Sequence, residues 1–171
     1  MTAKDGITLV CPKLSRCGDA FLLYDDQEAV IIDTGEKKDV DVLLDLLKER
    51  EITSVEALIL THFDKDHIGG APAVLERIPV DRCYMTCGSE DNDEFRDLMR
   101  ALNKAGTEQI VVTEPEEFQA MDVGFTIYPP LTEVFEKDQD NNLSLIISVD
   151  APQDHLLFTG DAEDERMDQR S

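Results

Sequence analysis

The chain is poor in basic residues. It has 16 Lys and Arg against 38 Asp and Glu, which gives a formal net charge of −22 at pH 7. The few short basic stretches, "EKK" and "LKER", are typical of solvated helix ends. A surface this acidic repels nucleic-acid backbones unless a basic patch or a bound cation intervenes. Long nucleic acid is therefore not expected as a partner.

Long apolar runs are also absent. No run approaches the roughly 20 residues that a membrane-spanning helix needs. The start, "MTAKDGITLV", lacks the apolar region of a secretory signal. We therefore expect no membrane partner and a cytoplasmic protein.

Cysteines are few, and they lie at positions 11, 17, 83 and 87. In a cytoplasmic chain they are expected to be reduced thiols. The pair in "CYMTC" has no second pair and no neighbouring His, so it is a weak candidate for a zinc knuckle, which usually needs four ligands.

What the chain does contain is enough for one folded domain, which we assign to residues 1–171. Its length of 171 residues and hydrophobic fraction of 42% suit a single core. "AFLLY" and "AVIID" predict a hairpin, and apolar spacing predicts helices in 39–51, 71–78 and 91–106, the last ended by Gly106. Further strands are predicted in "VEALIL", "RCYMTC", "QIVVTE", "FTIYP", "LSLIISV" and "HLLFTG". These alternations predict a sheet-rich α/β fold with helices outside.

Histidine is scarce, and two of the three His residues lie in one stretch, "THFDKDHIGG". This stretch directly follows "VEALIL", at the carboxyl end of a strand, where α/β sheets usually present their chemistry. His62, Asp64, Asp66 and His67 should therefore gather on one loop. Without a cation, carboxylates this close would repel each other and raise each other's pKa values. The stretch is typical of a divalent metal site.

Three other segments place a carboxylate at a predicted strand end. "AVIIDTG" carries Asp33, "DNNLSLII" opens a strand with Asp140, Asn142 and Ser144, and "HLLFTGDAE" carries Asp161. Any one of them is a weak signal, because Asp is common in turns and helix caps. Together with "THFDKDHIGG", in this order, they strongly indicate a metal centre.

These four motifs resemble those of the metallo-β-lactamase-fold hydrolases. "THFDKDHIGG" resembles the HxHxDH signature with Asp64 in place of the second His. Within the superfamily, the motifs resemble the hydrolase domain of DNA-uptake competence proteins and their soluble relatives, over residues ~6–165. The resemblance implies an αββα sandwich, which here lacks its C-terminal strand and helix.

The resemblance also implies roles for the motif residues. The metal ligands would be His62, Asp64 and Asp140 in the first site, Asp66 and His67 in the second, and Asp161 as the bridge. Asp33 would orient the ligand loop, with Asn142 and Ser144 as further support of the site. His155 matches no motif and is expected at the surface.

Two departures from the family pattern shape the cofactor prediction. Carboxylates replace His at Asp64 and Asp140, which favours a harder ion such as Mn²⁺, while Zn²⁺ still fits. We expect one or two divalent ions. In addition, no His follows Asp161, although the family carries a final His ligand beyond this motif.

The chain is therefore expected to be C-terminally incomplete. "HLLFTGD" is apolar on both faces and is predicted as a central strand, which needs neighbours. The short helix predicted after it has Met167 as its only large apolar anchor. An exposed sheet edge near the C-terminus would follow, with self-association as one outcome.

The function implied is metal-dependent hydrolysis by a metal-activated water, with Asp66 as the catalytic carboxylate that handles the proton. A small-molecule or short phosphodiester is the expected substrate. Two alternatives stay open. One is a catalytically impaired metal-binding remnant or interaction domain, and the other is a hydrolase of an ester, thioester or lactam.

Overall fold

The computed structural model describes residues 6–15, 18–88, 92–132, 139–152 and 154–168, with the backbone alone at 139, 140 and 165. No helix in this described part is long and apolar enough to cross a membrane. The helices and strands, in chain order, are β1 (Thr8–Val10), β2 (Ala20–Tyr24), β3 (Ala29–Thr34), α1 (Val40–Glu49), β4 (Val55–Leu60), α2 (Lys65–Ile68), α3 (Ala71–Arg77), β5 (Val80–Met85), α4 (Asp93–Ala105), β6 (Glu108–Val111), β7 (Glu116–Ala120), β8 (Val123–Tyr128), α5 (Gln139–Asn142), β9 (Ile146–Asp150), β10 (His155–Phe158) and α6 (Asp164–Asp168).

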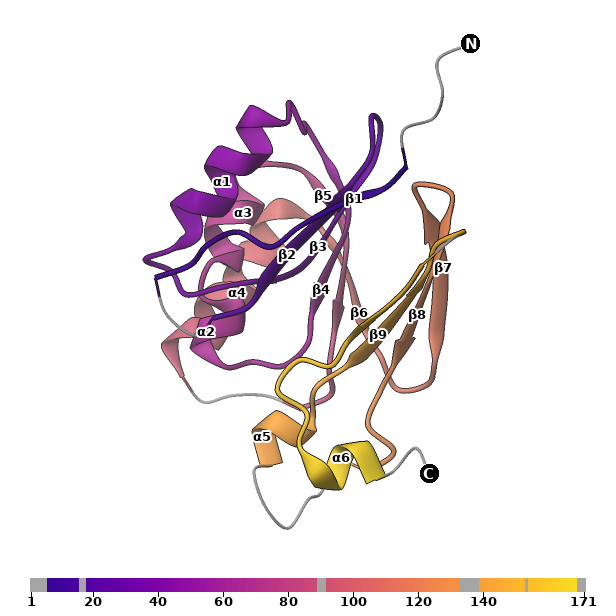
Figure 1. The fold of residues 1–171 in the computed structure, drawn as a ribbon. Helices are drawn as coiled ribbons and strands as arrows, with labels where there is room; N and C mark the ends of the chain where they lie inside the picture. The colour runs from indigo at the N-terminus through magenta and orange to yellow at the C-terminus, as the bar shows by residue number, and fades with distance from the viewer. Residues whose placement is uncertain (1–5, 16–17, 89–91, 133–138, 153, 169–171) are drawn as a thin grey trace.

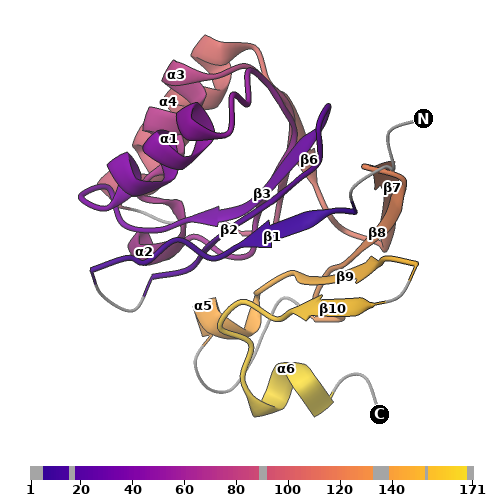
Figure 2. The same cartoon turned by 45° about the horizontal axis from the view of Figure 1, so that its top comes forward.

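The strands form two sheets that face each other (Figures 1 and 2). The first has the order β1-β2-β3-β4-β5-β6, with β3 to β6 parallel and β1 and β2 antiparallel to their neighbours. The second is antiparallel, in the order β10-β9-β8-β7. Helices α1, α3 and α4 cover the outer face of the first sheet (Figure 2). This arrangement confirms the predicted mixed α/β sandwich.

The central strands of the first sheet are buried on both faces, as their continuous apolar runs predict. Ile31 and Leu58 face the core beneath the helices. Ile32 and Ile59 face the core between the two sheets. Burial of such a side chain contributes about 1.5–3 kcal/mol to folding. The two cores therefore fix the register of β3 and β4, whose ends carry the candidate site.

Helix α4 begins and ends where its sequence predicts. The side chain of Asn92 accepts a hydrogen bond from the backbone N–H of Phe95 at 2.8 Å, which satisfies one of the free donors of the first turn. Gly106 follows the helix with a left-handed φ of 72°, a conformation that favours glycine. Leu98 and Leu102 are fully buried against the first sheet.

Strand β7 was not predicted. It pairs with β8 through a hairpin in which Ala120 lies opposite Val123. The two turn residues, Met121 and Asp122, both have positive φ, at 55° and 57°. Such turns usually contain Asn or Gly, so the turn residues gave no hairpin signal. In β7, "EEFQA", only Phe118 and Ala120 are apolar, and two residues are too short an alternation to predict a strand.

Two expectations for the C-terminal segment are wrong and one is confirmed. Strand β10 is an edge strand and pairs with β9 alone among the described residues, instead of lying centrally. Its Leu157 is 54% exposed, because its outer face has no covering element in the described part. Within the described residues, the predicted exposed sheet edge is therefore present. In α6, Met167 is 40% exposed and does not anchor the helix.

Candidate metal centre

The site is built where β3 and β4 end side by side. These strands are parallel, with Ile32 opposite Ile59, so the residues that follow them meet at one edge of the sheet. Leu145, just before β9, donates its N–H to the carbonyl oxygen of Thr61 at 2.8 Å. This bond brings the second sheet to the same edge.

Asp33 owes its orientation to a β-bulge. In the pairing of β2 with β3, Ala20 lies opposite Thr34 and Phe21 opposite Ile32, so Asp33 is the extra residue. Its backbone has a left-handed φ of 55°, and such bulges redirect side chains at functional sites. The carboxylate is 1% exposed and points to the ligand loop.

The Asp33 carboxylate fixes both ends of that loop. One oxygen accepts the N–H of Thr61 at 2.8 Å. The other accepts the hydroxyl of Thr61 at 2.6 Å and lies 2.9 Å from Nδ1 of His67. A carboxylate on Nδ1 leaves Nε2 of the same ring as the atom available to a cation.

His62, His67 and Asp161 offer ligand atoms that all lie within 4.8 Å of one another. Nε2 of His67 is 3.4 Å from one Asp161 oxygen, and Nε2 of His62 is 3.9 Å from the other. The two imidazole centroids are 4.0 Å apart. Asp64 adds a carboxylate oxygen 3.6 Å from Nε2 of His62. These separations are too long for direct bonds and suit donors around a shared ion.

The nitrogen of His62 supplies the test of whether this donor set fits a cation. His62 is 1% exposed, and its Nε2 is buried without a hydrogen-bond partner. A buried polar atom left unpaired costs free energy, yet this atom faces the carboxylates of Asp64 and Asp161. A divalent cation bound between them would satisfy the nitrogen and both carboxylates.

The charges of the site favour a positive ion. Burial lowers the pKa of His67, but the hydrogen bond with Asp33 and the charges of Asp33, Asp161 and Asp66 outweigh it and raise the pKa to about 9. The neighbouring His62 imidazole lowers the pKa of Asp64, although burial acts against this. The same carboxylates that favour the protonated imidazole would favour a bound cation at this position.

The family model of the Metallo-beta-lactamase superfamily matches residues 18–167. The chain belongs to this superfamily. It is 33% identical to ComE operon protein 3 of Bacillus subtilis (strain 168) over 131 residues, which are 77% of this chain and 16% of that protein. It is 27% identical to Recombination protein 2 of Haemophilus influenzae over 152 residues, 85% of this chain and 17% of that protein. The resemblance found in the motifs is thus confirmed.

Ribonuclease Z of Nocardia farcinica is a third relative, 28% identical over 123 residues, which are 68% of this chain and 39% of that protein. Among solved structures, a mutant metallo-beta-lactamase from Cronobacter sakazakii matches with a TM-score of 0.62 and 14% identity, over 90% of this chain and 60% of that chain. That likeness supports the fold alone. The chain spans about a sixth of the length of the first two relatives.

The other metallo-β-lactamase motif residues are placed as follows. Asp66 is half-buried in the first turn of α2. It lies outside the tight His62–His67–Asp161 group, although its charge acts on His67. The side chain of Asp140 lies outside the described residues, so its role as a ligand stays a prediction. Its backbone belongs to α5, and the expected strand begins only at Ile146.

Asn142 and Ser144 both lie beside the segment that carries Asp161, and their support of the site stays a prediction. The Asn142 side chain accepts the N–H groups of Glu163 and Arg166, at 2.9 and 3.3 Å, because the first turn of α6 has free donors. Ser144 is fully buried, and its hydroxyl has no hydrogen-bond partner. It lies beside Gly160, where an added Cβ would come within 3.0 Å of the hydroxyl oxygen.

Arg166 is a structural residue of the site that the sequence did not reveal. It is 1% exposed and donates to the carbonyl oxygens of Pro129 at 2.8 Å, Tyr128 at 3.2 Å and Ser144 at 3.4 Å. These bonds hold α6, and with it the turn that carries Asp161, against the second sheet. A buried Arg satisfied by backbone carbonyls leaves no periodic pattern in a sequence.

Residues expected outside the site lie outside it. His155 is exposed and its Nδ1 lies 2.7 Å from an oxygen of Asp150. Cys11 and Cys83 carry free thiols, and burial raises the pKa of the Cys83 thiol. No group of potential metal ligands in the described residues includes a cysteine, and Cys17 lies outside them.

Proposed function

We propose that the chain is a metal-dependent hydrolase that acts on a small-molecule or short phosphodiester. The observation that carries the proposal is the buried, unpaired Nε2 of His62 facing the carboxylates of Asp64 and Asp161. Membership of a superfamily of metal-dependent hydrolases supports it, as does the relative named ribonuclease Z. The net charge of −22 disfavours long nucleic acid. The cytoplasmic location stays a prediction.

Within this proposal, His62, His67 and Asp161 hold one or two divalent ions, Zn²⁺ or Mn²⁺, with Asp64, Asp66 and Asp140 as further ligands. When bound, such an ion lowers the pKa of a water molecule and stabilises developing negative charge. Asp33 keeps His67 and Thr61 in place. The half-buried carboxylate of Asp66 accepts or relays the proton of the attacking water.

The test is hydrolysis of bis-p-nitrophenyl phosphate by chelator-treated protein to which Zn²⁺ or Mn²⁺ is returned. We expect activity only with metal. His62→Gln should remove both bound metal and activity, whereas the matched variant His155→Gln, at an exposed His, should change neither. Elemental analysis of each variant gives the bound metal independently of turnover.

The two alternatives give different results in the same experiment. Bound metal without hydrolysis of any substrate indicates a metal-binding remnant or interaction domain. Hydrolysis of a thioester, ester or lactam, with the phosphodiester left intact, indicates the third class. A chain that binds no metal contradicts all three, because each depends on the ligand set.

We also propose that β10 allows self-association. Edge strands present unpaired backbone groups to other chains, and Leu157 on this edge is 54% exposed. Leu157→Lys should reduce any dimer seen on a sizing column. Val42→Lys, at a 41% exposed position on α1, is the control. A chain that runs as a monomer at all concentrations contradicts this proposal.

A further inference from the structure

Asp19 lies at the candidate metal centre, although no motif pointed to it. It ends the loop that leads into β2, and its carbonyl oxygen accepts the N–H of Gly35 at 2.8 Å. This bond holds the loop beside the end of β3, next to the bulge that redirects Asp33. The sequence around it, "CGDAF", reads only as an ordinary turn before a strand.

The neighbouring Gly18 shows how tightly this loop packs on the ligand segment. A Cβ added at Gly18 would come within 2.8 Å of the carbonyl oxygen of Asp66 and 3.6 Å of its Cβ. A larger residue therefore cannot fit without moving α2. The residue next to Asp19 is thus in contact with a predicted metal ligand.

Asp19 lies beside the candidate centre but, like Asp66, outside the group whose ligand atoms lie within 4.8 Å of one another. It is half-buried and helps to line a cavity of about 310 Å³ together with Asp33, Thr61 and Gly160. Burial raises its pKa; His67 lowers it, and the carboxylates of Asp33, Asp161 and Asp66 raise it further. No described residue gives this carboxylate a hydrogen bond. Such a group is costly to place among other carboxylates unless a cation offsets the repulsion.

An independent observation at the same centre points to a cation. The Nε2 atom of His62 is buried, unpaired and directed at Asp64 and Asp161. The centre therefore has both an unsatisfied nitrogen donor and an excess of carboxylates.

We propose that the Asp19 carboxylate is a further cation ligand, on the Asp66 side of the centre. With Asp66, His67 and the shared Asp161 it would complete a set of four protein donors, the usual number for zinc. Gly18 makes this possible by letting the loop approach Asp66. The inference rests on the proposed function, since it requires that the centre binds metal.

The test measures the Zn²⁺ affinity of Asp19→Asn and of the wild type. Chelator-treated protein is titrated with Zn²⁺ in a calorimeter. The matched control is Asp26→Asn, which removes the same charge from an exposed position at the other end of the β2–β3 hairpin. Residues that only support a ligand already change metal affinity by about 10–100-fold. We expect Asp19→Asn, as the loss of a ligand, to weaken one Zn²⁺ by at least about 100-fold, the upper end of that range, and Asp26→Asn to change nothing.

Thermal unfolding in chelator separates ligation from a structural role. Without metal, Asp19→Asn should melt at the same temperature as the wild type or higher, because one repelling carboxylate is gone. With Zn²⁺, its gain in melting temperature should be smaller. Asp19→Ser, which also removes the carboxylate, should behave in the same way and guards against a folding defect specific to Asn.

The results distinguish this inference from the proposed function. If the wild type binds no Zn²⁺, both fail. If the wild type binds Zn²⁺ and both Asp19 variants bind it with unchanged affinity and stoichiometry, the inference alone is overturned. It is also overturned if both variants melt well below the wild type in chelator, since Asp19 would then serve the fold.

Discussion

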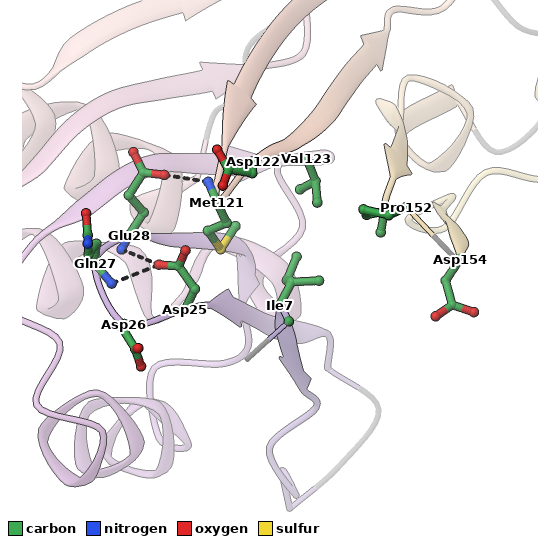
Figure 3. A pocket seen from close by; sticks show the side chains of 12 residues that line it. Ile7, Asp25, Asp26, Gln27, Glu28, Met121, Asp122, Val123, Pro152 and Asp154 are labelled. Carbon is green, nitrogen blue, oxygen red and sulfur yellow. Dashed lines mark hydrogen bonds between the residues drawn. The ribbon is translucent and has the colours of Figure 1, made fainter. Parts of the chain in front are cut away.

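Carboxylates gather at both ends of the sandwich, and the two groups differ in what they bind. At the end opposite the metal centre, a cavity of about 810 Å³ is lined by the acidic side chains of Asp25, Asp26, Glu28, Asp122 and Asp154 (Figure 3). One Asp25 oxygen accepts the N–H groups of Gln27 and Glu28, both at 2.8 Å. Glu28 accepts the N–H of Met121. None of the described residues that line this cavity is a histidine.

At the metal centre, by contrast, the carboxylates face imidazoles. Asp33 satisfies the backbone and hydroxyl of Thr61 and also contacts His67, but Asp64 and Asp161 face the unpaired nitrogen of His62. At the far end, Asp25 and Glu28 accept hydrogen bonds from backbone N–H groups of turns. At the metal centre, the carboxylates of Asp64 and Asp161 leave Nε2 of His62 without a hydrogen-bond partner. A cluster of acidic residues therefore indicates a metal site only where nitrogen donors are aimed into it.

The largest expected difference between the two ends is in the effect of a carboxylate substitution on catalytic activity. Asp66→Asn keeps the shape of the side chain but removes the charge that holds metal and handles the proton. Hydrolysis of bis-p-nitrophenyl phosphate should fall by about 100-fold or more, while far-ultraviolet circular dichroism stays unchanged. Asp26→Asn at the far end should retain full activity. Equal activity of both variants would remove Asp66 from the mechanism.

Metal removal should give the next largest effect, measured as thermal stability. A ligand at 100 times its Kd stabilises the folded state by about 2.7 kcal/mol, or about 5–10 °C for a chain of this size. Chelator should lower the melting temperature by this amount, and Zn²⁺ or Mn²⁺ should restore it. His62→Gln should be insensitive to chelator. A wild type that is equally insensitive would show that the near end binds nothing.

In the metal-free, chelator-treated protein, a smaller effect of pH on folding stability is expected. The folded-state pKa of His67, about 9, lies above its ordinary value of 6.5, so the folded state binds this proton more tightly than the unfolded state does. The stabilisation is complete below pH 6.5 and is lost as pH rises through about 9. Denaturant titrations at pH 6 and pH 9.5 measure it. Asp33→Asn, which removes the partner of His67, should reduce the difference.

The smallest effect should come from the far end. Asp25→Ala removes an acceptor of two backbone N–H groups, a loss worth about 1 kcal/mol of stability. Metal content and activity should not change. A loss of bound metal in this variant would mean that the two ends are coupled, and the contrast between them would fail.

Much of the fold could be predicted because its signals are local. Apolar runs buried on both faces mark β3 and β4, and a cap and a glycine mark the ends of α4. The metal motif could be predicted because parallel strands bring their ends together. The bulge at Asp33 and the buried guanidinium of Arg166 were missed because they depend on contacts between distant residues. The turn at Met121–Asp122 is local and was missed because neither residue is Asn or Gly.

Asp19 and Asn142 show the same limit within the site. The role of each depends on which loop lies beside it: Gly18 packs against Asp66, and the Asn142 amide accepts from the start of α6. A single sequence does not contain these pairings. Residue type at a strand end therefore predicts that a centre exists more reliably than it predicts which neighbours complete it.

The position of Asp161 determines which end of the sandwich should unfold locally first. His62 and His67 follow a strand of the first sheet, whereas Asp161 follows a strand of the second, more than half the chain away. A cation shared by these residues would act as a cross-link that closes a very long loop. At the far end the Glu28–Met121 hydrogen bond joins the sheets. In the metal-loaded protein, fraying should start at the far end, so that its amides exchange with solvent first and those next to Thr61 last.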